Sequence, residues 1–131
     1  MTTKRKPIKR KERYKRILIV DDDEIVAHLI KEILERQGFK TEVARDGIEG
    51  LEKIKQNEYD VIISNRAMPR MRGDQLYLEV QKLSQKLAKR IIFISGDITD
   101  FIRSTGNRFL AKPFSHQQLI EVVKDLIVSD M

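Results

Sequence analysis

Short apolar segments alternate along this chain with longer segments in which apolar residues recur every three or four positions. A short apolar segment rich in β-branched residues predicts a buried strand, whereas the longer spacing predicts an amphipathic helix. Five segments predict strands, at residues 17–20, 39–44, 61–63, 91–94 and 108–111. A helical segment follows each of them, so the pattern predicts a (βα)5 chain of the α/β class.

Several helix ends carry residues that satisfy free backbone groups. Asp46 and Ser115 are expected to cap two helices at their N-termini, and Gln118 completes a capping box with Ser115. Gly38 follows the first helical segment at a position where a left-handed cap is expected. These positions predict where three of the helices begin or end.

The connection between the third and fourth strands is predicted to be one helix. Asp74 is expected to cap it, and its apolar positions continue to Leu87. In contrast, residues 98–105 leave room for at most about two helical turns before the fifth strand.

Five strands joined by helices predict right-handed crossovers and a doubly wound parallel sheet. Ligands of such sheets bind outside the carboxyl ends of the strands. The polar residues that follow the predicted strands are Asp21, Asp22 and Asp23 after the first, Asn65 after the third, Ser95 after the fourth and Lys112 after the fifth. These side chains are therefore expected to converge at one edge of the sheet.

The length of 131 residues favours a single folded domain. Without cysteine the chain forms neither disulfides nor thiolate metal sites. No segment approaches the roughly 20 consecutive apolar residues of a membrane span. The sequence therefore predicts a soluble, cytoplasmic protein that does not contact a membrane.

The net charge of +6 is unevenly distributed, because the first 16 residues contain nine Lys and Arg and one Glu. Residues 1–14 are expected to form a basic, disordered tail and residues 15–131 the domain. The part of the chain after residue 16 is slightly acidic, with 17 basic and 19 acidic residues. Residues 4–16 could contact nucleic acid or an acidic partner, and such contacts would be salt-sensitive and independent of base sequence.

The converging side chains have the chemistry of a phosphoryl site. Adjacent carboxylates at Asp21 and Asp22 repel each other unless a hard cation such as Mg²⁺ neutralises them. The Ser95 hydroxyl and the Lys112 ammonium group could hold a phosphoryl group beside that cation. Only the nucleophile is missing, and Asn65 stands where a carboxylate would complete the site.

Four motifs together resemble the response-regulator receiver domain of two-component signalling: ILIVDDDE at 17–24, DVIISNRAMPRMRG at 60–73, FISGD at 93–97 and FLAKPF at 109–114. The resemblance covers about 115 residues, from Lys15 to Val128. It implies a flavodoxin-like fold with strand order 2-1-3-4-5. It also implies a histidine kinase or an output protein as partner.

The resemblance assigns a role to each residue of the site. Asp21 and Asp22 correspond to the acidic pair that holds Mg²⁺, and Ala67 would supply a backbone carbonyl to the same ion. Ser95 corresponds to the switch hydroxyl and Lys112 to the phosphate-contacting lysine. Phe109 corresponds to the switch aromatic residue, although a packed core position is an equal alternative.

Asn65 departs from the family, because it occupies the position of the phosphoaccepting aspartate. An amide nitrogen is a poor nucleophile, since its lone pair is delocalised into the carbonyl. The chain is therefore expected to be a regulatory interaction module and not an enzyme, with weak or absent Mg²⁺ binding. Both a natural variant, in which Arg66, Arg70 and Arg72 compensate, and a deliberate Asp-to-Asn substitution fit this pattern.

A second departure is the short segment of sixteen residues between Ser95 and Lys112, which puts the family's usual dimer face in doubt. No output domain follows Met131, so we expect a stand-alone receiver or part of a longer regulator. Two other functions remain open. One is a phosphatase resembling the haloacid dehalogenases, with Asp21 as nucleophile, and the other is nucleic-acid binding through the basic tail.

Overall fold

Strands and helices alternate through residues 15–129, the part of the chain that the computed structural model describes. The tail predicted for residues 1–14 lies outside the described residues. The elements are β1 (Arg16–Val20), α1 (Glu24–Arg36), β2 (Lys40–Ala44), α2 (Gly47–Gln56), β3 (Val61–Asn65), α3 (Gly73–Leu83), α4 (Gln85–Ala88), β4 (Ile91–Ser95), α5 (Asp100–Thr105), β5 (Phe109–Ala111) and α6 (His116–Val128).

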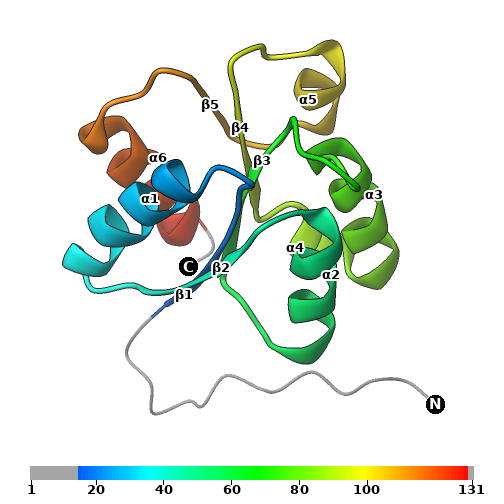
Figure 1. Ribbon diagram of the computed structural model, residues 1–131, viewed down its shortest axis with the longest axis horizontal. Helices are drawn as coiled ribbons and strands as arrows, with labels where there is room; N and C mark the ends of the chain where they lie inside the picture. Colours follow the sequence, from blue (N-terminus) through cyan, green and yellow to red (C-terminus); the bar gives the residue numbers. More distant parts are fainter. Residues whose placement is uncertain (1–14, 130–131) are drawn as a thin grey trace.

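The five strands form one parallel sheet in the order β2-β1-β3-β4-β5, which confirms the predicted fold class and strand order (Figure 1). Their carboxyl ends are in register, because Val20 pairs with Ser64 and Ser95 pairs with Ala111. The residues after these ends are therefore held at one edge of the sheet, as the sequence pattern predicts.

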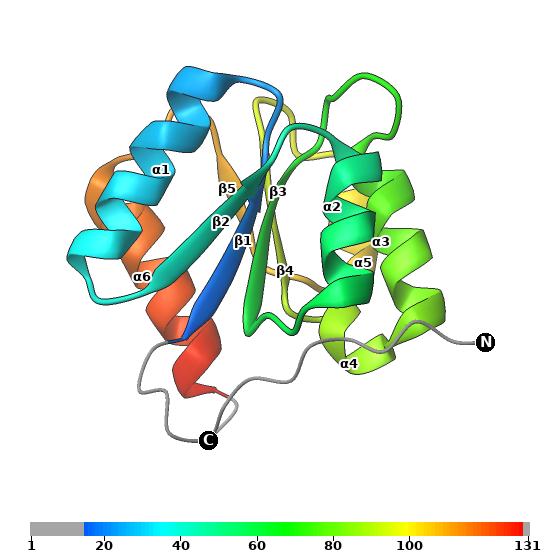
Figure 2. The same ribbon diagram turned by 60° about the horizontal axis from the view of Figure 1, so that its bottom comes forward.

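Helices cover both faces of the sheet (Figure 2). Helices α1 and α6 lie on one face, and α2, α3, α4 and α5 lie on the other. Alternate residues of β1 point into the two cores: Leu18 and Val20 into one, Ile17 and Ile19 into the other. Because β1, β3 and β4 are buried on both faces, their sequences are almost continuously apolar.

Three predicted helix ends are confirmed. The Asp46 carboxylate accepts a hydrogen bond from Glu49 N at 2.9 Å at the start of α2. Ser115 and Gln118 form the predicted capping box of α6, with bonds of 3.1 Å and 2.8 Å. Gly38 has a φ of +93° and follows Gln37, the C-cap residue of α1. Local sequence alone determines these ends.

The helix predicted from Asp74 to Leu87 is wrong at its start and in its continuity. Helix α3 begins at Gly73, so Asp74 lies within the first turn and forms an ion pair with Arg66 instead of capping the helix. The helix stops at Leu83, because Ser84 has an extended backbone and its hydroxyl accepts a hydrogen bond from Leu87 N at 3.0 Å. Ser84 thereby caps the separate short helix α4.

Helix α5 has six residues and ends at Gly106, where φ is +74°. This agrees with the prediction of at most two turns. Among the helices of residues 15–129, none has both the length and the hydropathy needed to cross a bilayer.

Candidate functional site

Asn65 is the last residue of β3, and its side chain lies between the loops that follow β1, β3 and β5. It is 7% exposed. The Asn65 Nδ2 group donates to Asp22 Oδ1 at 3.2 Å and to the carbonyl oxygen of Ala67 at 3.0 Å. Asn65 Oδ1 accepts a hydrogen bond from Lys112 Nζ at 3.2 Å. The structure thus brings together four of the residues that the sequence predicts for the site.

These contacts fix the orientation of the amide. If the amide were reversed, its oxygen would face Asp22 Oδ1 and the Ala67 carbonyl, both of which are acceptors. Its NH2 group would face the Lys112 ammonium group, which has only donors. All three contacts would then be repulsive, so the amide nitrogen points at the acidic side of the site.

Asp21 lies beside this network and is 3% exposed. Its Oδ1 accepts a hydrogen bond from Asp23 N at 2.9 Å, whereas its buried Oδ2 has no hydrogen-bond partner. Burial raises the pKa of the Asp21 carboxyl above its ordinary value; the Asp23 hydrogen bond and the Lys112 charge oppose this shift, and the charges of Asp22 and Asp23 add to it. A cation near Oδ2 would be favourable.

The third acidic residue has a structural role. Asp23 Oδ1 accepts hydrogen bonds from Ile25 N at 3.0 Å and from Val26 N at 3.2 Å, and so caps α1. A helix cap therefore explains Asp23 but neither Asp21 nor Asp22.

Ser95 ends β4, and its hydroxyl is directed into its own loop. It donates to the Asp97 carbonyl at 2.6 Å and accepts from Asp97 N at 3.1 Å. Within residues 15–129 it makes no hydrogen bond to Asn65 or Lys112 through its side chain. The Lys112 backbone N–H does donate to the Ser95 carbonyl at 2.9 Å, which aligns the ends of β4 and β5.

Phe109, on the edge strand β5, is 37% exposed. The guanidinium carbon of Arg103 lies 5.6 Å from its ring centroid, in the range of a cation–π contact. Of the two interpretations that the sequence left open, the packed core position is wrong.

Sequence reasoning missed the ion pairs that hold the loop between β3 and α3. Arg70 Nε donates to Asp46 Oδ2 at 2.7 Å, and Arg66 Nε lies 3.4 Å from Asp74 Oδ1. Arg70 also has a left-handed backbone, with a φ of +65°. Both arginines thus pair with carboxylates outside the Asn65 network, so the structure gives no support to their compensating for the missing aspartate. The three arginines of this loop, Arg66, Arg70 and Arg72, were the sequence feature from which these ion pairs could have been predicted.

The site residues of this chain do not fit Mg²⁺ in the arrangement that the family implies. Asp22 Oδ1 and the Ala67 carbonyl are two of the expected ligands, and both accept hydrogen bonds from the Asn65 amide nitrogen. Only the Asp21 oxygen without a partner favours a cation. No group of three or more His, Cys, Asp or Glu side chains within residues 15–129 could hold a metal ion.

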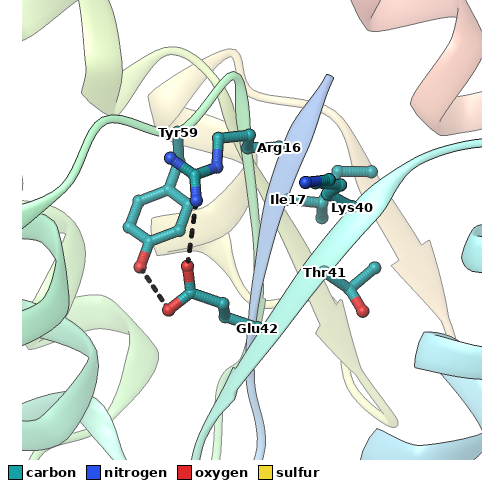
Figure 3. A pocket seen from close by; sticks show the side chains of 6 residues that line it. All are labelled: Arg16, Ile17, Lys40, Thr41, Glu42 and Tyr59. Carbon is teal, nitrogen blue, oxygen red and sulfur yellow. Dashed lines mark hydrogen bonds and ion pairs between the residues drawn. The ribbon is translucent and has the colours of Figure 1, made fainter. Parts of the chain in front are cut away.

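A small pocket of about 70 Å³ lies at the amino ends of β1 and β2, at the opposite end of the sheet (Figure 3). Tyr59 donates a hydrogen bond to Glu42 Oε1 at 3.1 Å, and Arg16 lies 3.9 Å from the same carboxylate. Burial, followed by the Glu42 charge, raises the pKa of Tyr59 above its ordinary value. This pocket is separate from the Asn65 network.

Known proteins are similar to this chain in both sequence and fold. The family model described as the response regulator receiver domain matches residues 17–124. The transcriptional regulatory protein CutR of Streptomyces coelicolor is 30% identical over 114 residues, which cover 85% of this chain and 52% of CutR. The transcriptional regulatory protein GlrR of Escherichia coli is 31% identical over 114 residues, which cover 85% of this chain and 26% of GlrR. The chain thus spans about half or less of these relatives.

Solved structures agree. The receiver domain of the Francisella response regulator 1452 superimposes with a TM-score of 0.79 at 32% identity, covering 89% of this chain and 99% of that one. The response regulator TrrA of Thermotoga maritima, in complex with Mg²⁺-BeF, gives a TM-score of 0.78 at 30% identity, covering 86% and 98%. These matches do not favour the phosphatase alternative. The chain belongs to the response regulator receiver domain family.

Proposed function

We propose that this chain is a receiver domain that regulates a partner protein without accepting a phosphoryl group. The observation that carries the proposal is the Asn65 amide, held at the convergence of three strand ends by hydrogen bonds to Asp22, Ala67 and Lys112. An acceptor at this position needs a carboxylate oxygen with a free lone pair. The amide offers no such oxygen, because Oδ1 carries no negative charge and is far less nucleophilic than a carboxylate oxygen.

The other site residues keep their expected roles within this proposal. Asp21 and Asp22 supply the acidic side of the site, Lys112 supplies the positive side, and Ser95 and Phe109 are the groups that would change position in a switch. Mg²⁺ binding is weak or absent, because the site has one negative charge fewer than a site with aspartate. The domain itself catalyses no reaction.

The partner is a histidine kinase or an output protein, as for other response regulators, and the complex forms in the cytoplasm. CutR and GlrR are named as transcriptional regulators and are longer than this chain. We infer that residues 15–131 form the receiver domain and that any such output function lies outside it.

The test is the mass of the intact protein after incubation with Mg²⁺ and acetyl phosphate. We expect the unchanged chain to gain nothing and Asn65→Asp to gain roughly 80 Da, the mass of one phosphoryl group. Asn57→Asp, a matched substitution at the C-cap of α2, should gain nothing. A phosphoryl group on the unchanged chain that survives in Asn57→Asp would overturn the proposal.

A second measurement addresses the phosphatase alternative. The unchanged chain should not hydrolyse a generic aryl phosphate. Hydrolysis that disappears in Asp21→Ala would show that Asp21 is a nucleophile and that the chain is an enzyme.

A further inference from the structure

We propose that the Asn65 amide takes the place of the divalent cation, so that the domain holds its site together without metal. This inference rests on the proposed function, because it concerns the same residues. It goes beyond the loss of phosphorylation, since it assigns a positive structural role to the residue that replaces the acceptor.

The first argument is that the amide is fully used. An amide NH2 group has two donors, and Asn65 directs them at Asp22 Oδ1 and the Ala67 carbonyl. Its oxygen accepts from Lys112. The side chain is 7% exposed, so breaking these bonds would leave polar atoms with little access to water.

The second argument is that the two acceptors are the ones that a cation would otherwise bridge. Asp22 and Ala67 belong to loops that follow different strands, β1 and β3. The partial positive charge of the amide hydrogens attracts both oxygens and so connects the two loops. Lys112 extends the connection to β5.

The third argument is that cation binding through the Asn65 side-chain oxygen and the observed hydrogen bonds exclude each other. An amide binds a metal ion through its oxygen. Turning Asn65 Oδ1 towards Asp22 would break three hydrogen bonds and place the NH2 group against the Lys112 ammonium group, so the free energy of cation binding would be reduced by the cost of this rearrangement.

The experiment compares thermal unfolding in EDTA and in about 10 mM MgCl2, since a ligand that binds only the folded state raises Tm. For the unchanged chain, we expect Tm to differ by less than about 1 °C between the two conditions. Asn65→Asp should have a lower Tm in EDTA, because the carboxylate repels Asp22, and should regain roughly 3 °C or more with Mg²⁺. Asn65→Ala should have a lower Tm in both conditions. Asn57→Asp serves as the matched control and should respond to Mg²⁺ as the unchanged chain does.

Two results would overturn the inference. One is a rise in the Tm of the unchanged chain with Mg²⁺ that equals the rise of Asn65→Asp. The other is an Asn65→Ala variant as stable as the unchanged chain in EDTA, because the amide would then hold nothing together.

A second readout needs no variant that must fold. In ¹H–¹⁵N spectra of the unchanged chain, the Asn65 side-chain NH2 signals should keep their shifts on addition of Mg²⁺ and should not broaden with low concentrations of Mn²⁺. Selective broadening of these signals would contradict the inference. This inference can fail while the proposed function holds. A chain that binds Mg²⁺ tightly but gains no phosphoryl mass would contradict the inference and would still be a receiver that is not phosphorylated.

Discussion

Gly73 lies against the backbone of Asn65, at the start of α3. A Cβ atom at Gly73 would stand 2.6 Å from the Asn65 carbonyl oxygen and 3.0 Å from Arg66 Cα. Both neighbours are backbone atoms, so Gly73→Ala requires the loop and the end of β3 to move apart. We expect a loss of about 2 kcal/mol in the free energy of unfolding.

The matched control for this substitution is Gly96→Ala. Apart from the two adjacent residues, no part of the protein lies within 4 Å of a Cβ placed at Gly96. Urea unfolding should therefore show a change within about 0.5 kcal/mol for this variant. An equal loss in both variants would mean that the close approach of Gly73 to Asn65 is not the cause.

Asp21→Asn is expected to stabilise the domain in the absence of metal by about 1 kcal/mol at neutral pH, because it removes a buried charge with one oxygen that has no hydrogen-bond partner. Burial raises the pKa of Asp21 in the folded state, so the destabilisation is fully present above this raised pKa. It disappears as pH falls through the raised pKa towards the ordinary value of 3.8.

The advantage of Asp21→Asn in urea unfolding should therefore shrink between neutral pH and about pH 4. Glu52→Gln, at an exposed position of α2, is the control for removing an acidic charge and should change stability little at either pH. An Asp21→Asn variant less stable than the unchanged chain in EDTA would contradict this prediction.

Asp46 joins α2 to the loop after β3. Burial tends to raise the pKa of Asp46, but the hydrogen bonds from Glu49 N and Arg70 outweigh it and lower the pKa below 3.8. Asp46→Ala removes a helix cap and an ion pair together, so we expect a loss of about 2 kcal/mol. Arg70→Ala should cost about 1 kcal/mol and Arg72→Ala, at an exposed position, less than about 0.5 kcal/mol.

The pH dependence of this contribution has the opposite sign to that of Asp21. Because the folded pKa of Asp46 is lowered, the stabilisation is present above pH 3.8 and is lost as pH falls through the lowered pKa. Urea unfolding of the unchanged chain and of Asp46→Ala should therefore converge in acid. A difference that is the same at pH 7 and below about pH 3 would show that the carboxylate charge is irrelevant.

The two phenylalanines of β4 and β5 should differ in their contribution to stability. Phe93 is 0% exposed, and its ring centroid lies 5.7 Å from that of Tyr77, whereas Phe109 is 37% exposed. Phe93→Ala should cost about 3–5 kcal/mol and Phe109→Ala about 1 kcal/mol. Equal losses of unfolding free energy for the two variants in urea would show that Phe109 contributes as a core residue does.

Short-range patterns in the sequence were sufficient to predict the sheet and several of the helix ends. Segments 17–20 and 91–94 contain only apolar side chains, so they predict buried strands without reference to any neighbouring strand. Asp46 and Ser115 bond to backbone groups three residues away, and a contact of this kind is encoded locally. The convergence of Asp22, Asn65 and Lys112 followed from the general geometry of parallel sheets.

Only the tertiary structure decided which atoms meet at that edge. The break at Ser84 is not of this kind: its hydroxyl accepts a hydrogen bond from Leu87 N, three residues away, so the signal was local and the apolar spacing that continues to Leu87 obscured it. Asp46, the partner of Arg70, and Asp22 and Lys112, two of the three partners of the Asn65 amide, are 24 to 47 residues away in the chain, so no local pattern specifies these contacts. Sequence determined that an amide stands at the acceptor position, and packing determined that its nitrogen faces the acidic residues, since that orientation alone satisfies all three neighbours.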